Sequence, residues 1–243
     1  MKKIAVITPY YKESLDVLDK CHKSVSDQSL KADHFFIADG HPNANLDQWN
    51  VKHIILPSAH ADNGNTPRGI GSVLAASEGY DLIAYLDADN WFHPNHLASL
   101  VKLHELTRAD ICSSFRTIHT LAGEEIVGLQ DSDEENLMHI DTSCYIFSKN
   151  AFDLFEIWLK MPKILSPLCD RVFFQGLIQS GLRFESTKQK TVAFRTQYKI
   201  HYLMANLPPP PGAKENVGKD CYEYLSSLDG IKQAVTRLGF VPL

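Results

Sequence analysis

Short apolar runs alternate with helically spaced apolar residues along the first half of the chain. Apolar runs that stop at Pro, Gly or Asp predict buried strands over residues 4–7, 35–38, 51–56 and 82–86. Helical spacing, or a Pro near a first turn, predicts helices over residues 13–25, 69–79 and 94–106. This alternation indicates an α/β fold with a mostly parallel sheet and helices on both faces.

The second half is less regular and predicts a mixed arrangement. Strands are predicted over residues 111–115, 144–147 and 192–194, a hairpin over 116–129 around Ala122-Gly123, and helices over 168–179 and 221–238. Residues 207–212 contain four consecutive prolines and can form neither a helix nor a central strand. They predict a stiff, exposed connector before the last helix.

Polar residues follow three of the predicted strands in the first half. Thr8-Pro9-Tyr10 follows the first strand, Asp39 follows the second, and Asp87-Ala88-Asp89 follows the fourth. Ligands of open parallel sheets bind in the crevice outside the carboxyl ends of the strands. We therefore expect these three segments to meet in one crevice.

Composition narrows the classes of function. The 243 residues include 24 Lys and Arg against 29 Asp and Glu, for a net charge of −5. This balance argues against a broad nucleic-acid surface, although it allows a local basic pocket. The five cysteines form no C-x-x-C pair, which argues against a disulfide framework or a structural zinc site and favours a reducing compartment.

Hydropathy gives no sign of a membrane span or a signal peptide. No apolar run approaches the roughly 20 residues that cross a bilayer. The run over residues 4–7 is too short for a signal peptide and is interrupted by Pro9, Lys12 and Glu13. We expect a cytoplasmic protein, and peripheral contact with a membrane stays open.

The carboxylates of Asp87 and Asp89 are candidate metal ligands. Two like charges close together at a strand end are costly unless a cation neutralises them. Oxygen ligands of this kind suit Mg²⁺ or Mn²⁺, which can also bridge phosphate oxygens. The pair taken alone is equally typical of a strand-to-helix turn, in which Asp caps the helix.

The surrounding motifs resolve this ambiguity. Thr8-Pro9-Tyr10, Ala38-Asp39-Gly40, the sequence NGNTPRGIG over residues 63–71 and the sequence AYLDAD over residues 84–89 occur in that order. With them, the chain over roughly residues 3–200 resembles the family 2 glycosyltransferases of the GT-A fold. Residues 63–71 match neither a P-loop nor the dinucleotide-binding fingerprint.

The resemblance implies roles for the residues at these strand ends. Thr8, Pro9 and Tyr10 would line the nucleotide, and Asp39 would bind the base, often uracil in this family. Arg68 would lie near the nucleotide or the diphosphate. Asp87 would contact the ribose or the metal, Ala88 would lie in the same nucleotide-sugar site, and Asp89 would ligate the metal. From the residues alone, Asp39 can also be a turn carboxylate, and Arg68 a surface residue at a helix start.

The resemblance also implies residues in the second half. The family's catalytic base is an Asp that opens a helix after the metal motif, and Asp170 matches that position. The family commonly has Glu-Asp there, whereas this chain has Cys169-Asp170. His201 would be a further metal ligand, and Asp141 would face the donor sugar or the acceptor. From the residues alone, Asp170 can also be an acid that stabilises a helix start. His201 can also be a surface or core histidine, and Asp141 a cap at the start of a strand.

The resemblance implies a GT-A domain over residues 1–206. Residues 1–107 would form its nucleotide-sugar-binding half and residues 108–206 its acceptor and catalytic half, followed by the connector and last helix over 207–243. No Gln-x-x-Arg-Trp motif marks a processive synthase. Asn90 stands where many relatives carry another acid, and we attach no consequence to it.

The function expected from the sequence is inverting, metal-dependent glycosyl transfer. A sugar would pass from a nucleotide-diphosphate donor, with a UDP-sugar favoured, to a hydroxyl of a glycan, lipid-linked or protein acceptor. Mn²⁺ or Mg²⁺ would be the cofactor, in bacterial-type surface glycan or glycoconjugate synthesis. Two alternatives stay open: a non-catalytic nucleotide- or glycan-binding domain of the same fold, and a sugar-nucleotide nucleotidyltransferase. The latter lacks its expected glycine-rich basic loop at residues 9–12.

Overall fold

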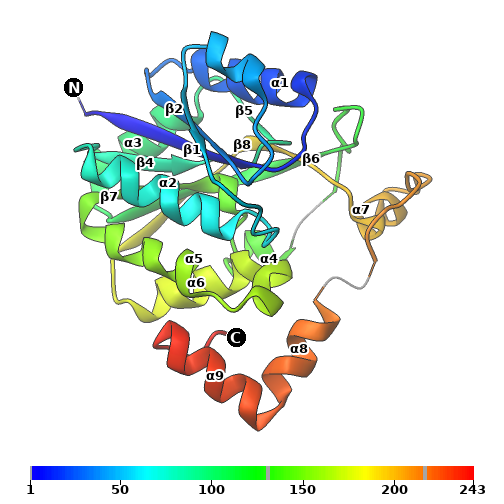
Figure 1. Ribbon diagram of the computed structural model, residues 1–243. Coiled ribbons are helices and arrows are strands. Elements are labelled where there is room, and N and C mark those ends of the chain that lie inside the picture. Colours follow the sequence, from blue (N-terminus) through cyan, green and yellow to red (C-terminus); the bar gives the residue numbers. More distant parts are fainter. Residues whose placement is uncertain (1, 130–131, 216–217) are drawn as a thin grey trace.

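A computed structural model describes residues 2–129, 132–215 and 218–243, without the side chains of residues 132 and 133. Its centre is an eight-stranded sheet with the strand order β3-β2-β1-β4-β7-β6-β8-β5 (Figure 1). The strands are β1 (Ile4–Tyr10), β2 (Asp33–Ala38), β3 (Lys52–Ile55), β4 (Leu82–Tyr85), β5 (Trp91–Phe92), β6 (Ile111–His119), β7 (Tyr145–Ser148) and β8 (Phe184–Arg195).

Helices cover the sheet, and the C-terminal helices lie farther from it (Figure 1). The α-helices are α1 (Leu15–Ser26), α2 (Asn65–Ser77), α3 (His96–Thr107), α4 (Ser132–Glu135), α5 (Glu156–Lys160), α6 (Cys169–Gln179), α7 (Lys199–Met204), α8 (Lys219–Ser226) and α9 (Leu228–Leu238). Short 3-10 helices are η1 (Ala44–Gln48), η2 (Thr142–Cys144), η3 (Lys149–Phe155) and η4 (Lys163–Leu168).

The first four strands of the chain, β1 to β4, form the parallel half of the sheet. β1 pairs in parallel with β2 and β4, and β2 pairs in parallel with β3. Successive residues of β1 point to opposite faces. Thr8 Oγ1 lies 4.0 Å from the Cys21 sulfur on α1, whereas Ile7 packs against Gly71 on α2. The helices α1 and α2 therefore cover opposite faces, which confirms the predicted α/β architecture.

The second half of the sheet is mixed, as expected. β7 is antiparallel to both β4 and β6, and β8 is parallel to β6 but antiparallel to β5. The predicted hairpin over 116–129 is reduced to a turn with one bridge between His119 and Glu125. Residues 115–119 pair instead with residues 190–195 of β8, which makes both strands longer than predicted.

The predicted helix over residues 221–238 is two helices. The helix is interrupted at Ser227. The Ser227 hydroxyl accepts a hydrogen bond from the Gly230 N–H at 3.0 Å and caps the start of α9. The C-terminal segment packs back on the domain: the Cys221 thiol donates to the Ile164 carbonyl at 3.1 Å, and Phe240 lies against Gly176. The domain boundary after residue 206 stays a prediction.

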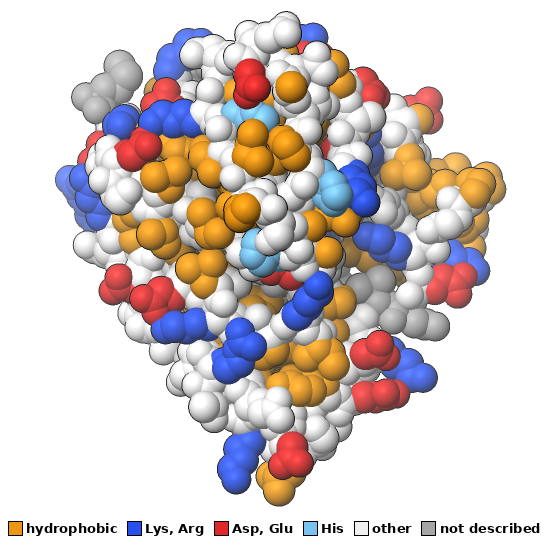
Figure 2. Space-filling model, in the orientation of Figure 1, with side chains coloured by type: hydrophobic (Ala, Val, Ile, Leu, Met, Phe, Trp, Pro, Cys, Tyr) orange, Lys and Arg blue, Asp and Glu red, His pale blue; other side chains and the backbone are white. Residues whose placement is uncertain are grey.

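Exposed apolar side chains gather on α7 and the segment that follows it. Ile200, Leu203 and Met204 are each more than half exposed, and Leu207 precedes the prolines. Figure 2 shows this apolar surface at the right of the molecule. Among the described residues, no helix combines the length and the apolar character that crossing a bilayer requires.

Gly71 lets α2 approach the sheet. A Cβ at this position would lie 2.8 Å from Ile7 Cγ2 and from Ile37 Cγ1, both in buried strands. We expect Gly71→Ala to lower the free energy of unfolding by about 1–3 kcal/mol, because this overpacking outweighs the gain in helix propensity. Urea unfolding measures the change, with the exposed Val73→Ala on the same helix as control. A Gly71→Ala protein as stable as the parent would contradict this packing.

Candidate functional site

One cavity of about 720 Å³ opens at the carboxyl ends of β1, β2 and β4. Most of the residues predicted from the sequence line it: Pro9, Tyr10, Asp39, Arg68, Asp87, Ala88, Asp89, Asp141 and Asp170. They come from segments that are up to 161 positions apart in the chain. The expected convergence of strand ends is therefore present, and the second half of the chain contributes to the same cavity.

Two of the predicted residues do not line this cavity. Thr8 is fully buried, and its hydroxyl forms a hydrogen bond with His34 Nε2 at 2.8 Å. His201 lies on α7, with its Nδ1 2.7 Å from the Thr196 hydroxyl. Thr8 thus links β1 to His34 of the neighbouring β2, and His201 is not among the residues that line the cavity.

Arg68 is buried rather than placed on the surface. It is 2% exposed, lies over the Trp158 ring, and donates to Asp87 Oδ1 at 2.6 Å. Burial raises the pKa of Asp87, the Arg68 charge opposes this shift, and Asp141 raises the pKa further. The ion pair therefore holds Asp87 at the cavity wall, and Trp158 is a core residue.

Asp89 has no ion-pair partner in the part of the chain that the structure describes. Burial, and next the charge of Asp87, raise the pKa of Asp89 to about 7. A cation bound here would restore the carboxylate. The described residues contain no cluster of three or more His, Cys, Asp or Glu that could hold a metal. Asp87 and Asp89 still suit an ion that takes its other ligands from phosphate and water, as Mg²⁺ does.

Asp39 holds the loop that precedes α2. Its Oδ1 accepts hydrogen bonds from the His60 N–H at 2.8 Å and from His60 Nδ1 at 3.0 Å. Its Oδ2 accepts from the Ala61 N–H at 2.9 Å. The carboxylate is 3% exposed and also lines the cavity, so it can shape a base-binding wall through this loop.

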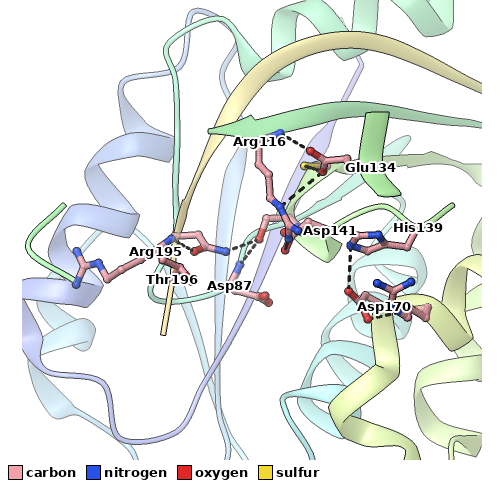
Figure 3. A network of polar contacts seen from close by, with 12 residues as sticks. Asp87, Arg116, Glu134, His139, Asp141, Asp170, Arg195 and Thr196 are labelled. Carbon is pink, nitrogen blue, oxygen red and sulfur yellow. Dashed lines mark hydrogen bonds and ion pairs between the residues drawn. The ribbon is translucent and has the colours of Figure 1, made fainter. Parts of the chain in front are cut away.

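Asp141 is both a cap and a cavity residue. Its Oδ1 accepts from the Ser143 N–H at 2.9 Å, which caps η2. Its Oδ2 accepts from Arg116 Nη1 at 2.6 Å, and Arg116 N–H donates to Glu134 Oε2 at 3.1 Å. Figure 3 shows this buried network next to the cavity, with Arg116 between the two carboxylates. Asp141 is therefore fixed in place at the wall.

Asp170 lies in the first turn of α6, where the helix dipole favours a carboxylate. Its side chain is 29% exposed and its Oδ2 lies 3.7 Å from Nε2 of the buried His139 (Figure 3). Cys169 takes the position that is commonly Glu in the family, and burial raises the pKa of its thiol. The carboxylate of Asp170 is thus the acidic group that α6 presents to the cavity at this position.

Sequence reasoning missed several residues of this site. Arg116, Glu134 and His139 support Asp141 and Asp170 from behind, and Arg195, Tyr198 and Lys214 line the cavity. Arg195 had a usable signal, because it directly follows the strand predicted over residues 192–194; in the structure it is the last residue of β8. The described lining is strongly acidic, with the cations Arg68, Arg195 and Lys214 against seven carboxylates: Glu13, Asp39, Asp62, Asp87, Asp89, Asp141 and Asp170.

Comparison with known proteins gives a consistent result. The sequence profile described as "Glycosyl transferase family 2" matches residues 5–159, which hold the first half of the sheet and Asp141. A search of curated protein sequences finds no match.

Solved structures share the fold over most of the chain. S. aureus TarS 1–349 in complex with UDP has a TM-score of 0.63 and 13% identity, over 97% of this chain and 70% of that one. The complex with UDP-GlcNAc gives 0.63 and 12%, covering 97% and 71%. A longer TarS chain gives 0.63 and 12%, of which only 43% is covered. At this identity the likeness shows the fold alone.

Proposed function

The chain belongs to glycosyltransferase family 2, and from this premise we propose that it is a metal-dependent, inverting glycosyltransferase with a nucleotide-diphosphate sugar as donor. The observation that carries the proposal is the meeting of Asp87, Asp89 and Asp170 in one cavity at the carboxyl ends of parallel strands. Displacement at an anomeric carbon needs a metal ion to neutralise the leaving group and a base to activate the acceptor. Two metal-binding carboxylates and a candidate base lie in this one cavity.

Asp87 and Asp89 would hold Mn²⁺ or Mg²⁺. The acidic lining supports this assignment, because seven carboxylates would repel a diphosphate in the absence of a further cation. When bound, such an ion supplies neutralisation of the charge that develops on the leaving diphosphate. Arg68 keeps Asp87 oriented and opposes the rise in its pKa, while the Asp87 side chain stays 31% exposed.

Asp170 would act as the general base. The acceptor hydroxyl oxygen attacks the anomeric carbon, its proton passes to an oxygen of Asp170, and the bond between that carbon and the diphosphate oxygen breaks. The nucleoside diphosphate leaves, and the configuration at the anomeric carbon inverts. His139, 3.7 Å from Asp170 Oδ2, would orient the carboxylate, and Asp141, which lines the same cavity, would face the sugar.

Donor and acceptor are proposed only as classes. A UDP-sugar is favoured because the similar TarS structures hold UDP and UDP-GlcNAc. The acceptor would be a hydroxyl of a glycan, lipid-linked or protein substrate in bacterial-type surface glycan synthesis. The exposed apolar residues of α7 are compatible with a lipid-linked acceptor. They also support the proposal that a cytoplasmic protein contacts the membrane peripherally through this helix. The segment before α7 lines the cavity through Gln197 and Tyr198.

A thermal-shift panel tests the proposal. UDP, GDP, CDP and dTDP are each added with and without Mn²⁺. A ligand that binds only the native state stabilises it by about 2.7 kcal/mol at a hundredfold excess over its dissociation constant. We expect one nucleotide, UDP by preference, to raise the melting temperature by several degrees, and only with metal. No metal-dependent shift with any nucleotide would favour a non-catalytic domain of the same fold instead.

A further inference from the structure

Two aromatic side chains from the second half of the chain line the cavity. Phe194 belongs to β8, and Tyr198 lies just before α7. Their rings are nearly parallel, at 5° to one another, with centroids 6.3 Å apart, and both residues are partly exposed. The other two aromatic residues of the described lining, Tyr10 and Tyr11, lie at the end of β1, where the nucleotide is proposed to bind. Phe194 and Tyr198 are thus available for a different ligand.

Backbone contacts fix the position of Tyr198. It forms a parallel bridge with Lys214. The Lys214 N–H donates to the Gln197 carbonyl at 2.7 Å, and the Lys199 N–H donates to the Lys214 carbonyl at 3.0 Å. The Tyr198 N–H donates to the Thr196 hydroxyl at 3.0 Å. The Tyr198 ring therefore extends from a backbone that is held in place, although it lies outside the sheet.

Phe194 is joined to the acidic wall of the cavity. It pairs with Ile118 in the ladder between β6 and β8. The guanidinium carbon of Arg116 lies 4.5 Å from the centroid of the Phe194 ring, and the same guanidinium donates to Asp141 at 2.6 Å. The two rings therefore lie beside the network that fixes Asp141.

The Tyr198 hydroxyl is a hydrogen-bond donor near the proposed base. Burial raises the pKa of this hydroxyl, and the negative charges of Asp170 and Asp141 raise it further. The phenol therefore keeps its proton at neutral pH. Within the part of the chain that the structure describes, the hydroxyl forms no hydrogen bond. A ligand in the cavity can therefore accept one from it.

An aromatic surface beside a general base suits a sugar ring. The C–H groups on one face of a pyranose are apolar and weakly positive, and an aromatic ring presents its negative face to them. The hydroxyls at the edge of the sugar need polar partners, which the Tyr198 hydroxyl and the cavity residue Gln197 can supply. A serine side chain or a linear polyol has no such face. The acidic lining also disfavours an anionic ligand.

We infer that the rings of Tyr198 and Phe194 form a platform for a neutral acceptor sugar, to which the Tyr198 hydroxyl donates a hydrogen bond. The inference rests on the proposed function, because it assigns the hydroxyl that Asp170 deprotonates to the sugar on this platform. It narrows the acceptor to a glycan. A lipid or a protein then qualifies only through a sugar that it already carries.

A comparison of acceptor probes tests this class. Release of the nucleoside diphosphate is measured with Mn²⁺ and with UDP-GlcNAc or UDP-glucose, or with the same sugars on the nucleotide that the thermal-shift panel selects. The probes are the methyl glycosides of glucose, galactose and N-acetylglucosamine, the polyols glycerol and ribitol, and a serine-containing peptide. We expect at least one methyl glycoside to stimulate release. Stimulation by a polyol or the peptide alone, or by no probe in a protein that binds nucleotide, overturns the inference.

Variants of the platform test the two side chains. Tyr198→Ala should raise the KM of the stimulating glycoside about tenfold or more, because both the ring contact and the hydrogen bond are lost. Tyr198→Phe keeps the ring and should raise it only severalfold. Neither change should alter the dissociation constant of UDP measured with Mn²⁺. Tyr222→Ala is the matched control, because Tyr222 is 51% exposed on α8 and does not line the described cavity.

Two results would remove Tyr198 from the acceptor site. One is an unchanged glycoside KM in Tyr198→Ala, and the other is a UDP dissociation constant that rises as much as the glycoside KM. If Tyr198→Ala does not fold, Tyr198→Phe and Phe194→Leu give the same comparison. If the parent bound no nucleotide, the proposed function would fail. Saturation-transfer NMR of the methyl glycosides with the parent and Tyr198→Phe proteins would still judge the platform.

Discussion

Asp170→Asn is expected to lower kcat about 10²–10⁴-fold, the usual contribution of a general base. The amide has nearly the shape of the carboxylate but cannot take the proton of the acceptor hydroxyl. Because Asp170 lies on α6, away from the β1 and β2 ends, metal-dependent nucleotide binding should persist in the variant. The loss should therefore appear in kcat with little change in the thermal shift given by the nucleotide. Steady-state assays with the donor identified by the nucleotide panel measure it.

A matched variant separates catalysis from helix stabilisation. Asp220 is also an acid in a first turn, that of α8, but it is exposed and does not line the described cavity. Asp220→Asn should lose the same weak dipole interaction, about 0.3–1 kcal/mol of stability, and keep full activity. An Asp170→Asn enzyme that behaves like Asp220→Asn would show that Asp170 is only a helix-start acid.

The sequence predicted the parts of the site that follow strand ends. Buried apolar runs locate parallel strands, and the edge where their carboxyl ends meet is set by the fold class. Asp39, Asp87 and Asp89 could therefore be assigned to one crevice before the structure was known. Asp170 was assigned for a different reason, because its place at the start of a predicted helix matches the family's pattern; from the residues alone it could equally be a helix-start acid.

The supporting residues could not be predicted because their partners depend on register. Arg116 reaches Asp141 only because β6 pairs with β8, with an irregular register between Ser113 and Arg116. The Asp39 carboxylate accepts hydrogen bonds from the backbone of His60 and Ala61. The loop that holds these two residues has no periodic pattern of apolar residues that would predict its position. Non-local contacts of this kind leave no pattern in one sequence.

One missed feature did have a local signal. Ser227 is followed by Asp229 and Gly230, a sequence typical of a helix start, and it breaks the single predicted C-terminal helix in two. The apolar spacing on either side concealed this break. For Arg68, a charged residue at a helix start is usually exposed, and its burial became visible only with Asp87 and Trp158 in place.

Asp89→Asn is expected to abolish metal-dependent nucleotide binding and to lower turnover about 10³-fold or more. A bound metal contributes several kcal/mol of charge stabilisation, and each 1.36 kcal/mol corresponds to a factor of ten in rate. An amide lacks the charge that attracts the ion, while its size leaves the loop undisturbed. Assays with and without Mn²⁺ measure the loss. A variant that keeps metal-stimulated turnover would remove Asp89 from the metal site.

Asp89 itself supplies a pH signature that checks the same assignment. Its pKa of about 7 in the metal-free protein lies above the ordinary aspartate pKa of 3.8, so folding takes up a proton at pH values between these two. Metal-free stability should fall as pH rises through this window, and Asp89→Asn should remove that slope. Metal binding must displace the proton, so the apparent Mn²⁺ affinity of the parent should drop up to about tenfold per pH unit below pH 7. Equal Mn²⁺ affinity at pH 6 and pH 8 would place the metal elsewhere.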